Sequence, residues 1–251
     1  MKKKILLYDI EVSPNVSYTW QGKYDQTVIE FQKEWELLSV AWKWLDGKTV
    51  KCITRKDYPN DTTDKSLAKD FLKVLNEADI TVTQNGIAFD AKKLNTRFIV
   101  HGLNPPSPNK AVDTLRIARK YFKFNSNKLN DLGRVLGVGQ KIQHNGFQLW
   151  LDCMAGKRAA WRKMIKYNKR DVLLLQKVYL KLLPWINNHP NVASIDKPDS
   201  CPKCGHHSLA NKGVVSNSVS TYRRYLCRKC KGYCKARTAE KTDRPKYVGI
   251  S

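Results

Sequence analysis

The apolar positions along the chain predict short strands in its first half. Residues 5–8 form a continuous apolar run bounded by polar residues, which is typical of a strand buried on both faces. The Asp46-Gly47 step between two later apolar segments favours a hairpin. Strands are therefore expected at residues 4–13, 34–44, 49–54, 80–83 and 111–112.

Helical spacing of apolar residues appears between and after these strands. Residues 66–77 carry apolar side chains at intervals of three and four, and Asp113 is well placed to cap a helix that begins at Thr114. Helices are expected at residues 66–77, 90–100, 114–122, 129–136 and 157–183, and loops at residues 13–24 and 137–146. This order predicts an α/β fold: a mixed sheet with an antiparallel hairpin beside parallel strands, flanked by helices.

A change of composition near residue 190 divides the chain. Residues 187–200 contain prolines and many polar residues, as a linker does, and pairs of cysteines follow. A chain of 251 residues has room for one sizeable domain and one small domain. We expect an α/β domain over residues 1–190 and a small domain with a basic tail over residues 191–251.

The strong positive charge indicates a polyanionic partner. The net charge is +24, with an isoelectric point near 9.8. Nucleic acid is the usual polyanion in this case, and no basic amphipathic helix favours a membrane surface instead. No apolar run approaches the roughly 20 residues that span a bilayer. The apolar run after the basic N-terminus is too short for a signal peptide, so we expect a cytoplasmic protein without a membrane partner.

Two carboxylates at the end of the first strand indicate a divalent-metal site. Asp9 and Glu11 are two residues apart, so a strand projects both from one face. Desolvated carboxylates repel each other unless a cation neutralises them, whereas acids on a strand that has reached the surface need no metal. Asp90 follows a predicted strand at the start of a helix, and Asp171 lies on the long helix, four residues after Tyr167.

These residues form motifs that resemble a known family. Asp9-Ile10-Glu11, the residues 85–90 (Asn-Gly-Ile-Ala-Phe-Asp) and Tyr167-x-x-x-Asp171 resemble, in this order, the three exonuclease motifs of the DEDD superfamily of RNase H-like 3′–5′ exonucleases. A tyrosine four residues before the last aspartate marks the DEDDy branch of that family. Residues 112–118, VDTLRIA, are similar to the exonuclease domain of B-family DNA polymerases and to its stand-alone phage and bacterial versions.

The resemblance, which covers residues 5–183, implies a fold and a mechanism. It implies an RNase H-like mixed sheet and hydrolysis of phosphodiesters at DNA 3′ ends, with single strands preferred, assisted by two Mg²⁺ or Mn²⁺ ions. Two cations about 3.5–4 Å apart stabilise charge on the attacking and the leaving oxygen, and both ions prefer hard oxygen ligands. By similarity, the metal ligands and catalytic acids are Asp9, Glu11, Asp90 and Asp171, and Tyr167 orients the attacking water.

Residues at this site admit structural roles as well. Tyr167 is a poor general base at neutral pH, and its alternative role is an aromatic packed over the site. Asn85 contacts the substrate or stabilises its local turn, and Asp113 is favoured as a helix cap over a rival metal ligand.

Cysteines near the C-terminus predict a structural zinc site. Two CxxC pairs flank a segment rich in Ser, Val, Thr and Tyr, which suits a β-hairpin. The four cysteines are Cys201, Cys204, Cys227 and Cys230. This spacing resembles a zinc ribbon, in which four thiolates bind one Zn²⁺ that supplies much of the stability of a small module. Cys234 competes with Cys230 as a ligand, and His206 and His207 are lesser candidates.

Basic residues beside both sites are candidates for nucleic-acid contacts. Arginine and lysine bind phosphates and tyrosine stacks on bases, although many charged faces are only solvated. The predicted contacts are Asn85, Arg162, Lys166, Arg170, Arg223, Arg224 and Arg228. Tyr18 and Trp20 either stack on a terminal base or pack into the fold.

The motifs together predict a metal-dependent 3′–5′ exonuclease whose zinc ribbon helps to bind DNA. Its expected partner is DNA with a free 3′ end, and a separate polymerase or recombination protein is a further candidate partner. A structure-specific endonuclease or an RNA-processing nuclease on the same fold is the first alternative. A non-catalytic nucleic-acid-binding adaptor is the second, and the full set of acids argues against it.

Overall fold

The computed structural model describes residues 3–20, 27–143, 146–193 and 196–240. Residues Lys4–Val178 form one compact unit, termed the N-terminal unit, and the chain from Tyr179 onward forms the C-terminal unit. Within the described ranges, no helix has both the length and the apolar character needed to cross a membrane.

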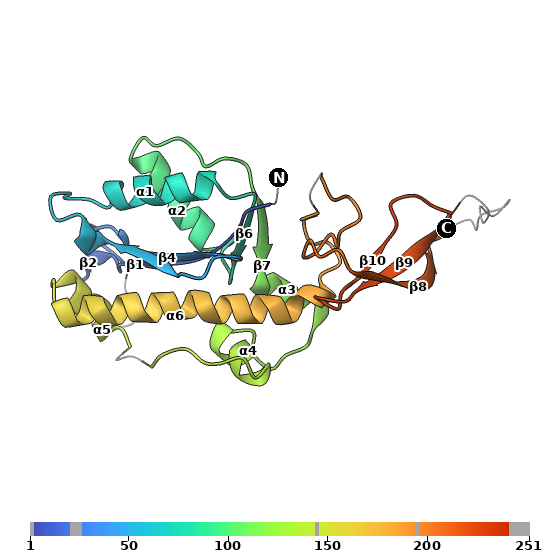
Figure 1. Ribbon diagram of the computed structural model, residues 1–251. Helices are drawn as coiled ribbons and strands as arrows, with labels where there is room; N and C mark the ends of the chain where they lie inside the picture. The colour runs from blue at the N-terminus through green and yellow to red at the C-terminus, as the bar shows by residue number, and fades with distance from the viewer. Residues whose placement is uncertain (1–2, 21–26, 144–145, 194–195, 241–251) are drawn as a thin grey trace. The chain divides into compact units, whose positions relative to one another are not determined.

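A mixed five-stranded sheet forms the centre of the N-terminal unit (Figure 1). In sheet order its strands are β5 (Lys51–Thr54), β4 (Leu37–Trp44), β1 (Ile5–Val12), β6 (Ile80–Thr83) and β7 (Lys110–Asp113). β1 pairs antiparallel with β4 and parallel with β6, so it lies where the hairpin meets the parallel strands. The predicted α/β class, with an antiparallel hairpin beside parallel strands, is confirmed.

Helices cover both faces of this sheet (Figure 1). α1 (Lys65–Asn76) and α2 (Asp90–Val100) lie over one face, where Leu6 and Phe71 belong to the larger apolar core. The long helix α6 (Arg158–Leu182) runs along the other face, where Met164 packs with Leu38. Among the described residues up to Trp185, the remaining elements are η1 (Arg55–Asp57), α3 (Thr114–Tyr121), α4 (Leu129–Val135) and η2 (Leu183–Trp185), besides three described below.

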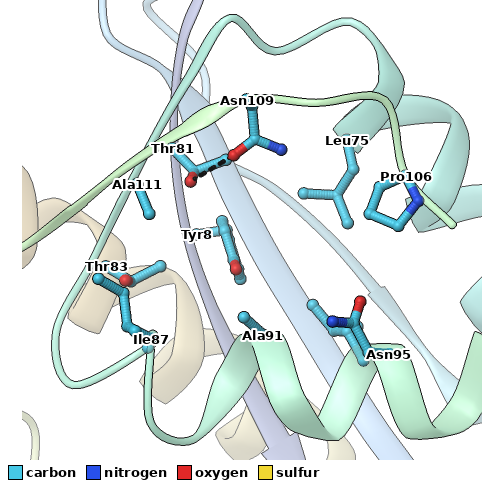
Figure 2. Close-up of a pocket in the computed structure, with 12 residues that line it drawn as sticks. Tyr8, Leu75, Thr81, Thr83, Ile87, Ala91, Asn95, Pro106, Asn109 and Ala111 are labelled. Atoms are coloured by element: carbon cyan, nitrogen blue, oxygen red, sulfur yellow. Dashed lines mark hydrogen bonds between the residues drawn. The ribbon is translucent and has the colours of Figure 1, made fainter. Parts of the chain in front are cut away.

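Side chains of β1 alternate between the two covered faces. Tyr8 points toward α2 and lines a hollow of about 170 Å³ together with Ala91 and Asn95 (Figure 2). Asp9 and Glu11 occupy the alternate positions, and the carboxylate of Asp9 contacts α6. One strand thus supplies an apolar core on one side and a pair of acids on the other.

Three short elements depart from the sequence-based expectation. β2 (Val16–Tyr18) and β3 (Glu30–Lys33) form a hairpin, so the expectation of a loop over residues 13–24 is wrong for β2. Their side chains are almost all exposed, and an exposed hairpin lacks the apolar alternation that reveals a strand. α5 (Gln148–Met154) was not predicted either, because a helix of two turns carries too little periodic signal. Residues 21–24 of the predicted loop lie outside the described residues.

A buried ion network joins α2 to β4 and to the start of α1. Both carboxylate oxygens of Asp64 accept hydrogen bonds from Nε of Arg97, at 2.9 and 2.8 Å. The backbone N–H of Leu37 donates to the same carboxylate at 2.8 Å, and Nε2 of His101 lies 2.6 Å from it. Burial by itself raises the pKa of Asp64, but the hydrogen bonds from Arg97 and Leu37 outweigh it and hold the pKa below its ordinary value.

We expect Asp64→Ala to destabilise the N-terminal unit by about 3–5 kcal/mol, because it leaves the guanidinium of Arg97 buried without a counter-charge. Glu77→Ala is the matched control, since Glu77 pairs with Lys4 on the surface, where an ion pair contributes about 0–1 kcal/mol. Urea unfolding measures both variants, and equal losses would contradict the assignment. Because the pKa of Asp64 is lowered, its contribution is present at neutral pH and is lost as the pH falls through that lowered value.

The C-terminal unit contains a three-stranded antiparallel sheet. Its strands are β8 (Leu209–Ser216), β9 (Thr221–Cys227) and β10 (Tyr233–Lys235), in the order β10-β9-β8. β8 and β9 pair antiparallel after the first cysteine pair, and β9 ends at Cys227 of the second, so the predicted hairpin is confirmed. Near the first pair, the buried Lys203 donates from Nζ to the backbone oxygen of Pro184 at 2.6 Å.

Candidate functional site

Three carboxylates from distant parts of the chain meet at one point of the N-terminal unit. Oxygens of Asp9, Glu11 and Asp171 all lie within 4.8 Å of one another. Asp9 and Glu11 are half-buried on β1, and Asp171 is buried on α6. The spacing of two residues on a strand and the packing of α6 against that face place these acids together.

Asp90 lies beside this cluster, at the first residue of α2. Its Oδ1 accepts a hydrogen bond from the backbone N–H of Ile10 at 3.2 Å. Ile10 stands between Asp9 and Glu11 on β1. The turn before α2 sets this position: Asn85 has a φ of 64°, and a Cβ on Gly86 would lie 2.2 Å from Oγ1 of Thr83. Only glycine fits at position 86 without moving β6.

Asp113 supports the same turn. Its carboxylate accepts from the backbone N–H groups of Asn85, at 2.9 Å, and of Leu115, at 3.0 Å. The prediction that Asp113 caps the helix from Thr114 is confirmed. The backbone of Asn85 is part of the turn, and its side chain lines the groove described below.

The four carboxylates repel one another when all of them are charged. Burial, followed by the charges of Glu11 and Asp90, raises the pKa of Asp9 well above its ordinary value. Burial and Asp171 raise the pKa of Glu11 to about 8, and burial raises that of Asp90 to about 7. Crowded, desolvated carboxylates of this kind fit hard divalent cations, which take oxygen ligands and neutralise the repulsion.

Lys141 contacts this cluster from the loop after α4. Its Nζ lies 2.5 Å from Oδ2 of Asp171 and 3.2 Å from the hydroxyl of Tyr167. Burial by itself lowers the pKa of Lys141, but the charge of Asp171 outweighs it and holds the pKa above its ordinary value. Burial and the charge of Asp171 likewise raise the pKa of Tyr167, so its hydroxyl keeps its proton at neutral pH. Lys141 was not among the site residues predicted from the sequence.

Asn168 was also missed, and it fixes the carboxylate of Asp9. Its Nδ2 donates to Oδ2 of Asp9 at 2.6 Å, and its Oδ1 accepts from Oγ of Ser39 at 3.1 Å. Asn168 and Ser39 are both fully buried. The hydroxyl of Ser39 on β4 therefore fixes the amide of Asn168, and this amide orients the carboxylate of Asp9.

We expect Asn168→Ala to weaken Mn²⁺ binding about 10–100-fold, because a metal ligand that loses its orienting partner typically loses affinity on this scale. Titration calorimetry on the full chain measures the change. Thr96→Ala serves as a control: the hydroxyl of Thr96 bonds only to the preceding turn of the exposed face of α2, at the Lys92 oxygen. Unchanged affinity in Asn168→Ala would show that Asp9 needs no such support.

We expect Mn²⁺ binding to strengthen as the pH rises through about 7 and 8, the raised pKa values of Asp90 and Glu11. Protons and metal compete for these carboxylates, so binding at neutral pH releases protons. Raised carboxyl pKa values also mean that the metal-free protein loses stability as the pH rises toward 8, and metal restores it. Calorimetry in two buffers of different ionisation heat counts the protons released, and none released would contradict this expectation.

A groove of about 650 Å³ opens beside the acids. Asp9 and Lys141 belong to its lining, together with Asn127 and Arg119. The further lining residues are Gln84, Asn85, Leu115, Asn125, Ser126, Lys128, Leu129 and Asn130. Most of the lining residues carry an amide, a hydroxyl or a cationic group, which suits a polar, anionic ligand.

The other predicted nucleic-acid contacts belong to the N-terminal unit and to the C-terminal unit. Arg162, Lys166 and Arg170 follow one another at four-residue intervals on α6, and Arg162 and Lys166 are exposed. Arg223, Arg224 and Arg228 are exposed in the C-terminal unit. In the hairpin region Tyr18 is 57% exposed and Trp20 is 86% exposed, so neither ring is packed into the core.

Four cysteines meet in the C-terminal unit. Their sulfurs lie within 4.8 Å of one another, as in a tetrahedral thiolate site, and they are Cys201, Cys204, Cys227 and Cys230. Cys201 lies 3.8 Å from Cys230 and Cys204 lies 3.6 Å from Cys227, measured between sulfurs. Among the described residues this group does not include Cys234, His206 or His207. The arrangement is compatible with a zinc ribbon.

A protein-family model matches more than half of this chain. A family model described as the RNase_H superfamily matches residues 32–183, a range that contains Asp90, Tyr167 and Asp171 but begins after Asp9 and Glu11. No curated protein matches the chain.

One solved structure with a similar fold is the family B DNA polymerase from the hyperthermophilic archaeon Pyrobaculum calidifontis. The match has a TM-score of 0.53 and 18% sequence identity. It covers 74% of this chain and 25% of the polymerase chain, so the likeness is one of fold over a quarter of that protein.

Proposed function

The chain belongs to the RNase H superfamily, and on this premise we propose that it is a metal-dependent 3′–5′ exonuclease that hydrolyses DNA. The observation that supports this most is the meeting of Asp9, Glu11 and Asp171 within 4.8 Å, with Asp90 bonded to the same strand. A nuclease of this superfamily needs divalent metal, and the donor set is made of hard oxygens.

Asp9, Glu11, Asp90 and Asp171 are the proposed ligands of two Mg²⁺ or Mn²⁺ ions. When bound, these ions stabilise charge on the attacking and leaving oxygens and make the attacking water more acidic. Tyr167 has a protonated hydroxyl, so it holds the water by hydrogen bonding and takes no proton from it. Lys141 donates to the oxygen of that hydroxyl and so helps to fix the position of the ring. Asn168 keeps Asp9 in place.

The groove beside the acids is the proposed path of the strand that carries the 3′ end. Its amides and hydroxyls are suited to phosphate and sugar oxygens, and Arg119 and Lys128 supply positive charge. The proposed occupant of the groove is a single strand. We further propose one structural Zn²⁺ at the four cysteines, with the ribbon adding nucleic-acid affinity, and a cytoplasmic location.

Digestion of end-labelled oligonucleotides tests the proposal. With Mg²⁺ or Mn²⁺ present, a 5′-labelled single strand is expected to give a descending ladder, and a 3′-labelled strand is expected to release its labelled mononucleotide first. Release of nucleotides from the 5′ end would overturn the polarity.

The same panel separates the alternatives. Cleavage of a circular single strand would indicate an endonuclease, and faster digestion of RNA than of DNA would indicate an RNA-processing enzyme. Binding without any metal-dependent cleavage would indicate an adaptor.

A further inference from the structure

The pairing of β8, β9 and β10 sorts the side chains of the ribbon sheet into two faces. Directly opposed residues of antiparallel strands share a face, and residues two apart along a strand share it as well. The register therefore places Leu226 with Tyr233, Arg224 with Lys235 and Tyr222 with Val215. This surface, termed the aromatic face, consists of Ala210, Val215, Tyr222, Arg224, Leu226, Tyr233 and Lys235.

Cations and tyrosine rings alternate on the aromatic face. Nζ of Lys235 lies 3.7 Å from the ring centroid of Tyr222, and the guanidinium of Arg224 lies 5.7 Å from that of Tyr233. Strand geometry spaces successive rows on one face by about 6.8 Å, so the row of Arg224 and Lys235 lies between the rows of the two tyrosines. The face offers a ring, a pair of cations and a second ring in sequence.

Three side chains of the aromatic face, those of Arg224, Tyr233 and Lys235, are available for contacts with a ligand. Nε and Nη2 of Arg224 both donate to the backbone oxygen of Lys212, at 3.1 and 2.9 Å, which fixes the guanidinium and leaves its other N–H groups for an anion. The ring of Tyr233 is 54% exposed. Lys235 is an exposed cation, so it can leave the ring of Tyr222 for a phosphate and give up only an exposed cation–π contact.

The opposite face of the same sheet differs in charge. Arg223 lies there, and its Nε donates to Oε1 of Glu240 at 2.8 Å, so its charge is paired. Tyr225 lies on that side too, opposite Cys234 and Asn211. In contrast, the described residues of the aromatic face include no carboxylate.

We propose that the aromatic face binds single-stranded nucleic acid, with bases stacked on Tyr222 and Tyr233 and the intervening phosphates on Arg224 and Lys235. Base stacking on an aromatic side chain contributes independently of sequence, and a cationic row between two rings follows the alternation of base and phosphate along a strand. Double-stranded nucleic acid would hide the base faces, so a single strand is the partner that this surface fits. The nature of the partner rests on the proposed function.

Fluorescence anisotropy of a labelled oligothymidylate with the full-length, zinc-loaded chain tests this inference. The chain carries Asp9→Asn, so that any cleavage is suppressed and binding alone is measured. Replacing both Tyr222 and Tyr233 by Ala is expected to weaken binding at least tenfold, whereas replacing both by Phe is expected to stay within about twofold. Tyr225→Ala, on the opposite face, is the matched control and is expected to stay within about twofold.

Two further measurements identify the stacking itself. Oligonucleotides with 5-iodouracil are expected to crosslink to Tyr222 or Tyr233, and an abasic oligonucleotide of the same length is expected to bind at least tenfold more weakly. Equal binding of the abasic strand, crosslinks at Tyr225, or full affinity in the double alanine variant with its zinc retained would each overturn the inference. Because no step requires cleavage, a loss of the proposed nuclease activity would not be mistaken for a loss of this surface.

Discussion

Asp9→Asn is expected to lower metal-dependent cleavage by about a thousandfold or more. Asp9 belongs to the cluster in which oxygens of Asp9, Glu11 and Asp171 all lie within 4.8 Å of one another, and Asn168 orients it. Removing the charge of Asp9 weakens the binding of the cations, which stabilise the transition state by several kcal/mol. Each loss of about 1.4 kcal/mol of this stabilisation lowers the rate about tenfold. Quantitative digestion of a 5′-labelled oligonucleotide at saturating Mn²⁺ measures the loss.

The same substitution is expected to raise the melting temperature of the metal-free protein. The pKa of Asp9 is raised in the folded state, which means that its charged form opposes folding at neutral pH. Asparagine removes the charge and keeps an oxygen for the amide of Asn168. Asp46→Asn, in the exposed turn after β4, is the control and is expected to leave both activity and stability within experimental error. A fully active Asp9→Asn protein would remove Asp9 from the mechanism.

Cys227→Ser is expected to unfold the ribbon sheet while the N-terminal unit keeps its structure. Cys227 is fully buried at the end of β9, and its sulfur lies 3.6 Å from that of Cys204. Few residues of β8 and β9 are buried, so little apolar core remains to hold this sheet once the metal is lost. Structural Zn²⁺ sites contribute about 10–16 kcal/mol at neutral pH. Hydrogen exchange by mass spectrometry measures protection over residues 209–235.

Cys234→Ser tests whether Cys234 is a ligand of the proposed zinc ion. Cys234 lies on β10, outside the group of four sulfurs, so its substitution is expected to leave one zinc per chain and normal protection. Loss of zinc in Cys234→Ser, with zinc retained in Cys230→Ser, would instead make Cys234 the fourth ligand. Elemental analysis of the purified proteins distinguishes the two results.

Local periodicity was sufficient to predict part of the candidate site. Asp9 and Glu11 share a face because β1 is a central strand with a period of two, and Tyr167 and Asp171 share a face because α6 is a long, regular helix. β6 and α2 were predicted with their observed bounds, since the turn at Asn85-Gly86 separates them sharply.

Residues that act through long-range packing could not be predicted in this way. Lys141 reaches the acids from a loop, where no periodicity fixes the path of the chain. Asn168 stands next to Tyr167 on α6, but its role depends on Ser39 and Asp9, which are 129 and 159 residues away in sequence. These partners become neighbours only when α6 packs on the sheet.

The central claim is that the acids of β1 and α6 hold divalent cations together, and anomalous diffraction from a crystal of the protein soaked in Mn²⁺ tests it most directly. We predict anomalous peaks bounded by Asp9, Glu11 and Asp171, with Asp90 beside them. Peaks confined to other parts of the surface, with the four acids free of manganese at saturating concentration, would contradict the account.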